Sequence, residues 1–365
     1  MRIFVFAIST LIFLGSCNFR ESSGTSGKFE VKSGTNVAHW LSQSSRRGVE
    51  REAFFTEADV QAIAQMGFDH IRLPIDEEQM WGESGARHPE AFRLLTSCID
   101  WCLRANLRVI VDLHILRSHY FNAAEKPLWT DPAEQEKFYN LWRDLSAALK
   151  SYPNHAVAYE LMNEAVADDP EQWNQLAARA IAVIRELEPG RTIVLGSNRW
   201  QSYATFDELK VPENDSNLIL SFHFYEPFLL SHYQAGWTSL KNYNGPVHYP
   251  GTILTAEEFS QLPDSIRPAV QNWVGRQFDQ TVLLEMFQEP LRKARSLGLP
   301  LYCGEFGIVA DAPAAERLSW YRDILALFRE NGIAFANWNY KSNNFGLVNG
   351  DGSRNEELIT ILAGQ

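Results

Sequence analysis

Two glutamates in this sequence could together carry out acid and nucleophilic chemistry. Glu164 ends the run AYELMNE at 158–164, and Glu305 ends the run LYCGE at 301–305. In both places a mostly apolar, strand-like segment gives way to a loop. Hydrolysis of a glycosidic bond needs one carboxyl group to protonate the leaving oxygen and a second to attack the sugar or activate water. Two carboxyl groups at the ends of two different strands therefore predict a glycosidase site.

Other polar and aromatic side chains stand at the ends of neighbouring apolar runs. In a parallel barrel the carboxyl ends of all strands converge on one face, so such groups would share one cleft. Asp112 lies two residues before one of them, His114, and on an alternating strand the two side chains share a face. We expect Asp112 either to orient a buried neighbour or to reach the substrate. The candidates for substrate binding and support are Arg72, His114, Asn163, His223, Tyr225 and Trp338.

Each candidate also has a simpler structural interpretation. A lone glutamate at a strand end is more often a helix cap or a surface ion pair than a catalytic group. Arg72 could form a salt bridge with Asp76 or Glu77 instead of serving a site. His114 and His119 are spaced in a way that could indicate a metal, but no third ligand is in register and no HExxH motif is present. We therefore predict neither a metal nor an organic cofactor.

Short apolar segments recur along the chain and alternate with helical periods. Runs such as RVIVDL at 108–113 are typical of parallel strands that are buried on both faces. Eight strands, most of them followed by a helix, predict a single (β/α)8 TIM barrel over residues 31–365. The alternative, a doubly wound open sheet, usually has a Gly-rich turn after its first strand, and 34–40 lacks one. The predicted strands are 31–37, 68–73, 107–113, 155–162, 191–196, 217–223, 299–304 and 333–338.

Capping signals mark several of the predicted helices. Asp131 and Asp169 are each followed by a proline and stand directly before an amphipathic period, as helix caps do. Another helix, rich in leucine and aromatic residues, should end at the Asn-Gly pair 331–332. The fifth helix, near 203–210, has a short and weak pattern.

One region interrupts the alternation of strands and helices. More than fifty residues separate the sixth predicted strand from the helical segment near 280, and they are rich in tyrosine and tryptophan. A loop this long in a compact domain is usually functional, so we predict an extended loop after strand six that contributes to the cleft. Four tryptophans in or near predicted loops are candidates for sugar-stacking subsites, with core burial as the open alternative for each. They are Trp40, Trp129, Trp200 and Trp237.

The amino terminus has the pattern of an export signal. Residues 1–17 form an apolar stretch behind a single basic residue and close with LGSC, which resembles the lipobox of bacterial lipoproteins. We predict lipidation of Cys17, with an ordinary cleaved signal peptide as the alternative, and a flexible tether over 18–30. The protein would be exported and held at a membrane, periplasmic or at the cell surface, only through its lipid, or else secreted.

Composition excludes some partners. The net charge of −12 argues against nucleic acid and anionic membrane surfaces, because both attract basic patches. Cys98 and Cys102 stand four apart on a predicted helix, and Cys303 lies in a predicted strand, so we expect three core cysteines rather than a disulfide or metal site. The expected partner is a polysaccharide or oligosaccharide substrate, bound by a monomer.

The order of groups at the strand ends closely resembles glycoside hydrolase family 5, the cellulase family, in the clan of (β/α)8 retaining glycosidases. That family has Arg after strand two, His after strand three, Asn-Glu on strand four, His-x-Tyr on strand six, Glu on strand seven and Trp on strand eight. All of these are matched over roughly residues 31–345, by Arg72, His114, Asn163, Glu164, His223, Tyr225, Glu305 and Trp338.

The resemblance implies a role for each matched residue. Glu164 would be the general acid/base and Glu305 the nucleophile. Arg72 and Tyr225 would keep the nucleophile ionised and in line, whereas Asn163 would bind the sugar 2-hydroxyl. The two histidines, His114 and His223, would line the cleft and bind sugar hydroxyls. Trp338 would be a sugar platform, and the family often has a cis peptide bond after this tryptophan.

The resemblance also implies an activity. The mechanism would be double displacement with retention, which requires carboxyl groups about 5–5.5 Å apart. The commonest substrate in the family is β-1,4-linked glucan, and β-mannan is the main rival, with xyloglucan and β-1,3-linked glucans left open. A non-catalytic glycan-binding lipoprotein is the alternative from another class. A phosphate-binding barrel enzyme would need phosphate-binding glycines after strands seven and eight, where Gly304 and Gly307 instead flank the predicted nucleophile.

Overall fold

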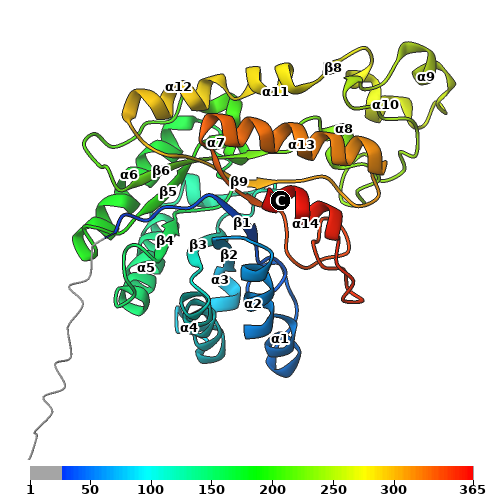
Figure 1. Ribbon diagram of the computed structural model, residues 1–365. Helices are drawn as coiled ribbons and strands as arrows, with labels where there is room; N and C mark the ends of the chain where they lie inside the picture. Colours follow the sequence, from blue (N-terminus) through cyan, green and yellow to red (C-terminus); the bar gives the residue numbers. More distant parts are fainter. Residues whose placement is uncertain (1–26, 365) are drawn as a thin grey trace, which may run out of the picture.

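Eight parallel strands form a closed barrel with helices around its outside (Figure 1). The computed structural model describes residues 27–364 of the chain. The barrel strands are β1 (Ser33–Asn36), β2 (His70–Asp76), β3 (Arg108–Ile115), β4 (Val157–Glu160), β5 (Ile193–Gly196), β6 (Leu218–Phe224), β9 (Leu301–Phe306) and β10 (Ala334–Asn337). They follow the order β1-β10-β9-β6-β5-β4-β3-β2, and β1 pairs with both β10 and β2, which closes the sheet. The predicted (β/α)8 barrel is confirmed.

Each barrel strand overlaps one of the eight segments that the sequence predicted. All residues of β2, β6 and β9 are buried, because helices cover the outer face of the sheet and the opposite strands cover the inner face. Strands buried on both faces need apolar side chains at nearly every position. That requirement is why uninterrupted apolar runs located the strands.

The helices begin and end where the capping signals predicted. The side chain of Asp131 accepts a hydrogen bond from the backbone N–H of Ala133, and that of Asp169 accepts one from Glu171. Gly332, with φ of 66°, ends the longest carboxyl-terminal helix in the left-handed conformation that glycine favours. The helices are α1 (Gly48–Phe54), α2 (Glu57–Gln65), α3 (Glu77–Met80), α4 (Pro89–Arg104), α5 (Pro132–Leu149), α6 (Pro170–Leu187), α7 (Asn198–Gln201), α8 (Phe228–Ser231), α9 (Ala256–Gln261), α10 (Arg267–Val270), α11 (Gln280–Met286), α12 (Gln288–Leu297), α13 (Ala314–Asn331) and α14 (Glu356–Ala363).

The predicted fifth helix does not form. Within 203–210 the structure has a single 3-10 turn, Tyr203–Thr205, followed by irregular chain. The irregular part is nevertheless anchored, because Phe206 is buried and its carbonyl accepts a hydrogen bond from Lys293 of α12 at 2.6 Å. Contacts with a neighbouring helix thus replace the bonds that a fifth helix would have made.

A layer of apolar side chains fills the amino-terminal end of the barrel interior. Phe29 belongs to this layer and is 2% exposed. It falls within 18–30, which was predicted to be a flexible tether, so the folded domain begins by Phe29 and the predicted boundary at residue 31 is too late. The rest of the tether up to residue 26, and the predicted signal peptide with Cys17, lie outside the described residues. The layer consists of Phe29, Ile110, Ala158, Val194, Ile219, Tyr302 and Ala336.

A long insertion follows β6, as predicted. It contains α8, α9, α10 and a small antiparallel sheet of β7 (Gly251–Thr252) and β8 (Gln277–Phe278) before α11 begins. Figure 1 shows this part extending beyond the barrel on the right of the view. Tyr243 and Tyr249 are buried inside it, whereas Trp237 is 56% exposed. The insertion is therefore a folded layer of its own that presents one tryptophan outwards.

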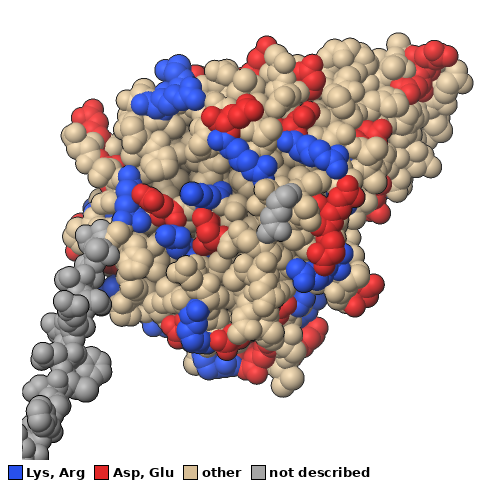
Figure 2. Space-filling view, viewed as in Figure 1, with Lys and Arg blue, Asp and Glu red and all other residues tan. Residues whose placement is uncertain are grey.

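The cysteines, the surface charges and the helix lengths complete the description of the fold. Cys98, Cys102 and Cys303 are buried and free, as expected of core cysteines. Acidic and basic side chains are interspersed over the face shown in Figure 2. In the part of the chain that the structure describes, no helix has the length and apolar character needed to cross a membrane.

Candidate active site

A cleft of about 1190 Å³ opens at the carboxyl ends of the barrel strands. The loops after the strands contribute its walls, as the shared polarity of parallel strands requires. Of the two glutamates and their six predicted supporting residues, only Arg72 does not line the cleft, since it is fully buried on β2. The groups that do line it are His114, Asn163, Glu164, His223, Tyr225, Glu305 and Trp338.

The two glutamates face each other across the cleft at short range. One carboxylate oxygen of Glu164, one ring nitrogen of His223 and one carboxylate oxygen of Glu305 lie within 4.8 Å of one another. Retaining glycosidases hold their carboxyl groups about 5–5.5 Å apart, whereas inverting enzymes need about 6.5–9.5 Å to admit a water molecule. The arrangement fits direct attack by a carboxylate on the sugar.

Arg72 holds three carboxylates together beneath the cleft. Its guanidinium lies 2.8 Å from Glu305, 2.6 Å from Glu160 and 2.9 Å from Asp112. Burial alone would lower the pKa of Arg72, but the three carboxylates raise it well above its ordinary value. The guanidinium therefore stays charged at every working pH. Breaking such a buried ion pair leaves an uncompensated charge, so the contact fixes the position of the Glu305 side chain strongly.

Glu305 has a donor on each carboxylate oxygen. Arg72 contacts Oε1, and the hydroxyl of Tyr225 donates a hydrogen bond to Oε2 at 2.9 Å. Burial raises the pKa of Glu305, and the charge of Arg72 together with the bond from Tyr225 opposes this rise. Both donors favour the ionised form, which is the form that can act as a nucleophile.

Glu164 holds its proton more strongly than Glu305 does. Burial, reinforced by the charge of Glu305, raises the pKa of Glu164 well above its ordinary value. Its Oε1 shares a hydrogen bond of 3.0 Å with Nδ1 of His223, and burial lowers the pKa of that histidine well below its ordinary value, so the ring is neutral. Glu164 therefore keeps its proton at a pH where Glu305 has lost its own, as an acid and nucleophile pair requires.

His114 is oriented by the acid that precedes it on β3. Its Nδ1–H donates a hydrogen bond to Asp112 at 2.7 Å, and burial lowers the pKa of His114 to about 4, so the ring is neutral. The ring lies parallel to the indole of Trp338, with centroids 5.8 Å apart. Of the two roles left open for Asp112, the structure supports that of orienting a neighbour. The peptide bond between Trp338 and Asn339 is cis, as expected.

Asn163 offers a free amide donor beside the two glutamates. Its Oδ1 accepts a hydrogen bond from Arg72 at 2.8 Å, and because arginine only donates, this contact fixes which way the amide points. Its Nδ2 is buried, and no group among the described residues accepts a bond from it. A buried donor without a partner is costly, so we expect a ligand hydroxyl to accept this bond.

The four candidate subsite tryptophans separate into two groups. Trp200 and Trp237 line the cleft and are 44% and 56% exposed. Trp40 is fully buried and its Nε1–H donates to the backbone carbonyl of Arg51, so the prediction of a subsite is wrong for it. The prediction is wrong for Trp129 as well, because its ring is buried edge-on to His119 and Trp173.

Several residues of the cleft were not predicted from the sequence. His39 lines the cleft with φ of 60°, and its ring meets that of Trp338 edge to face, with centroids 6.2 Å apart. Its only signal in the sequence was that a polar residue stands just after the first predicted strand. His232 and Phe345 also line the cleft, 5.8 Å apart, but they meet only through the fold and left no local signal. Glu160, which lies beneath the cleft against Arg72, did leave a signal in the sequence, since a carboxylate inside an apolar strand needs a buried cation.

Glu164, His223 and Glu305 also carry the kinds of ligand atom that a metal ion would need. Among the described residues, Glu164, His223 and Glu305 form the one group of His, Cys and acidic side chains close enough to share an ion. These donors already have protein partners, since Arg72 and Tyr225 bind Glu305 while His223 bonds to Glu164. We therefore assign the cluster to acid–base chemistry.

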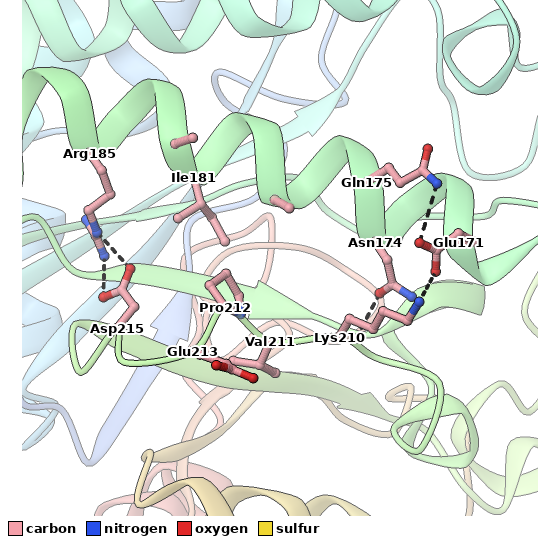
Figure 3. A pocket seen from close by; sticks show the side chains of 12 residues that line it. Glu171, Asn174, Gln175, Ile181, Arg185, Lys210, Val211, Pro212, Glu213 and Asp215 are labelled. Atoms are coloured by element: carbon pink, nitrogen blue, oxygen red, sulfur yellow. Dashed lines mark hydrogen bonds and ion pairs between the residues drawn. The ribbon is translucent and has the colours of Figure 1, made fainter.

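A second hollow, of about 470 Å³, lies between α6 and the segment 210–215 (Figure 3). Arg185 is paired there with Asp215, and Lys210 is paired with Glu171, as the dashed lines in the figure show. Both of its basic side chains are therefore already paired with acids, and it lies outside the barrel. The cleft with the two glutamates remains the candidate active site.

Comparison with known proteins places the chain among carbohydrate-degrading enzymes. A family model described as Cellulase (glycosyl hydrolase family 5) matches residues 30–344. Endoglucanase C of Acetivibrio thermocellus is 32% identical over 342 residues, which cover 91% of this chain and 98% of that protein. Cellodextrinase A of Ruminococcus flavefaciens is 28% identical and covers 82% of this chain and 83% of its own.

Solved structures share the barrel. Thermotoga maritima Cel5A in complex with cellobiose is 24% identical, with a TM-score of 0.72 over 91% of this chain and 97% of that chain. The complex of the same enzyme with mannotriose has a TM-score of 0.72 at 23% identity, over 91% and 97%. Similarity at this level supports the fold. On the strength of the family match and of its similarity to Endoglucanase C, the chain belongs to the cellulase family, glycosyl hydrolase family 5.

Proposed function

We propose that this protein is a retaining β-glycanase that hydrolyses β-1,4-linked glucan, with endo action. Two glutamates at close range support this assignment most directly, because the pKa of Glu164 is raised well above its ordinary value while Arg72 and Tyr225 oppose the rise at Glu305. The free amide donor of Asn163 beside them fits the bond to a sugar 2-hydroxyl that strengthens in the transition state. Membership of the cellulase family and the names of the relatives point to the same substrate class.

In the first step Glu305 attacks the anomeric carbon while Glu164 gives its proton to the glycosidic oxygen. The bond between anomeric carbon and glycosidic oxygen breaks, and an ester between the sugar and Glu305 forms. The leaving sugar departs with a new hydroxyl group. Arg72 and Tyr225 keep the attacking carboxylate ionised until this point.

In the second step water hydrolyses the ester. Glu164, now ionised, takes a proton from the water as its oxygen attacks the anomeric carbon. The ester bond breaks, Glu305 leaves as a carboxylate, and Glu164 is again protonated. Two inversions at the same carbon retain the β configuration.

The position of the two exposed tryptophans favours a long ligand. Trp200 follows β5 and Trp237 lies in the insertion after β6, and both reach the cleft from outside the central cluster. Aromatic faces of this kind suit stacking on sugar rings beyond the cleaved bond. We assign both to subsites and Trp338 to the platform beside the reacting sugar.

Mannan is the second candidate substrate. Mannose differs from glucose in the axial orientation of its 2-hydroxyl, which is the group that Asn163 would bind. A solved complex of Thermotoga maritima Cel5A contains mannotriose, so this barrel can admit both sugars in another protein. Nothing in the cleft favours mannan over glucan.

Product profiling tests the proposal. The chain from residue 18 onward would be assayed on carboxymethyl-cellulose, mixed-linkage glucan, glucomannan, pure mannan and xyloglucan. We expect cleavage of the glucans with a rapid fall in viscosity, and a loss of at least about 10⁴-fold in kcat for Glu305→Gln, because the nucleophile is gone. Preference for pure mannan would keep the mechanism and overturn the substrate, whereas no cleavage of any polymer would favour a glycan-binding protein.

We also propose that the protein is exported and anchored through a lipid on Cys17, and that it acts as a monomer. The apolar stretch and LGSC motif in residues 1–17 support export and lipidation. An anchor of this kind would hold the barrel beside a membrane while the cleft stays open to soluble chains. Light scattering of the purified chain from residue 18 would test the monomer.

A further inference from the structure

The loops after β4 and β5 are fastened to each other beside the cleft. The backbone N–H of Trp200 donates to the carbonyl of Ala165 at 3.1 Å. The side chain of Asn198 bonds to both the N–H and the carbonyl of Ala167, at 2.9 and 3.0 Å. Three hydrogen bonds therefore join the loop that carries Glu164 to the loop after β5.

The fastening turn has an unusual backbone. Three consecutive residues of α7, Arg199, Trp200 and Gln201, have φ of 53°, 61° and 51°. Left-handed conformations are rare for residues other than glycine, and clusters of them occur where function demands a particular geometry. Here the turn sends two neighbouring side chains in opposite directions, with Trp200 exposed in the cleft and Gln201 only 1% exposed inside the barrel.

Inside the barrel the amide of Gln201 meets the acid. Its Oε1 accepts a hydrogen bond from the backbone N–H of Glu164 at 2.9 Å. Its Nε2 donates to Ser221 at 3.1 Å and to Glu160 at 3.2 Å. These two bonds fix the orientation of the amide, so that Oε1 faces the N–H of Glu164. A Cβ on Gly196 would lie 2.3 Å from Cγ of Gln201, so only glycine leaves room for this side chain.

Glu164 needs an external support of this kind. Its own φ is 45°, in the left-handed region that glutamate seldom adopts. A residue held in such a conformation persists only when its surroundings determine it. The backbone N–H of Glu164 donates to the side chain of Gln201, and this bond holds the residue from outside its own loop.

We propose that Gln201 is a positioning residue for the acid/base, which it holds in the strained backbone conformation that aims the Glu164 carboxyl group at the glycosidic oxygen. This inference rests on the proposed function. The same amide continues through Glu160 to Arg72 and so to Glu305. One buried network thereby sets the place of both catalytic carboxyl groups.

Leaving-group dependence separates this role from a purely structural one. A misplaced acid slows cleavage only when the leaving oxygen needs a proton. The test uses Gln201→Met, which keeps the length of the side chain and removes its hydrogen bonds. Its substrates are aryl β-glycosides of the sugar that the wild-type enzyme prefers.

We expect kcat/KM for a phenyl glycoside, a poor leaving group, to fall about 10- to 100-fold in Gln201→Met. For the 2,4-dinitrophenyl glycoside, which departs without a proton, we expect a fall below about threefold. The kcat for the dinitrophenyl glycoside should fall, because hydrolysis of the glycosyl-enzyme needs Glu164 as base. Azide, which attacks the glycosyl-enzyme without help from a base, should restore it. The alkaline limb of the pH profile should also move, because it reports the acid/base.

Ser221→Ala is the matched control. It removes one bond to the same amide and leaves the bond to Glu164, so the ratio of kcat/KM for the two glycosides should match the wild type. Thermal unfolding of both variants shows whether they are folded. Equal losses of Gln201→Met on both glycosides, or no loss on either, would overturn the role of Gln201. A wild-type enzyme that cleaves neither these glycosides nor the polymers would overturn the proposed function and this inference with it.

Discussion

Glu305 and Glu164 are the same residue type in one cleft, and their partners give them different chemistry. Arg72 and Tyr225 each donate to one oxygen of Glu305, whereas Glu164 has a neutral histidine beside it and the charge of the other carboxyl group nearby. Donors favour the ionised form and a neighbouring negative charge favours the protonated form. Replacement of a single donor should therefore shift one limb of the pH profile.

Tyr225→Phe should move the acid limb of kcat/KM to higher pH. The hydroxyl of Tyr225 stabilises the ionised form of Glu305, so its removal raises the pKa of that carboxyl further, and more alkaline conditions are needed to ionise it. At the optimum we expect a loss of about 10- to 100-fold, the cost of one hydrogen bond to a charged group. A pH series of kcat/KM measures both effects.

The control for this prediction is Tyr139→Phe. Tyr139 lies on α5, on the outer layer of the barrel, so its hydroxyl should leave the profile unchanged. If Tyr225→Phe left the acid limb in place while lowering kcat, the tyrosine would serve the transition state rather than the ionisation of Glu305.

At the scale of elements, the barrel strands carry polar groups to the cleft at one end, and six of them contribute side chains to the apolar layer at the other end. The inner layer at the amino-terminal end includes Phe29, which comes from the chain before β1 rather than from a strand. Its ring fills space among Ile110, Ala158 and their neighbours from the other strands. The chain before β1 is therefore part of the stability of the barrel.

Phe29→Ala should lower the free energy of unfolding by about 3–5 kcal/mol, because a fully buried ring is replaced by a cavity that the rigid barrel end fills poorly. Val49→Ala is the control, since Val49 is 81% exposed and its truncation should cost no more than about 0.5 kcal/mol. Denaturant unfolding measures both. Equal costs for the two variants would mean that residues before β1 are a tether after all.

At the scale of the whole molecule, the barrel has its cleft at one end and the first described residues of the chain at the other. Phe29 lies in the amino-terminal layer, and the cleft lies at the carboxyl ends of the strands. A lipid attached through residues 17–28 would therefore hold the molecule by the end opposite the active site. Polymer access would not require the cleft to face the membrane.

Cys17→Ser should abolish the lipid anchor. In a bacterial host with lipoprotein processing, we expect the wild-type chain to incorporate labelled palmitate and to fractionate with membranes, and the variant to do neither. Cys98→Ser removes a buried cysteine instead and should keep the label. An unlabelled wild-type chain that is cleaved and soluble would show that residues 1–17 are an ordinary signal peptide.

The sequence by itself determined the barrel and the polar groups that stand at the ends of its strands. Strands buried on both faces must be apolar along their length, so the polar residues that end them stand out, as Glu164 and Glu305 do. Capping residues such as Asp131 and Asp169 marked helix starts because they bond to backbone only a few positions away. Interactions of this kind join residues close together in the chain, so the sequence shows them directly.

Only the tertiary structure decided which groups meet. Trp40 and Trp200 are alike in sequence, yet one is buried and the other is exposed in the cleft, because burial depends on what the rest of the chain places against a side chain. The role of Gln201 likewise depends on a left-handed turn and on the space above Gly196. The short separation of the two glutamates follows from closure of the barrel, which places the carboxyl ends of β4 and β9 around one cleft. No local pattern in the sequence encodes that distance.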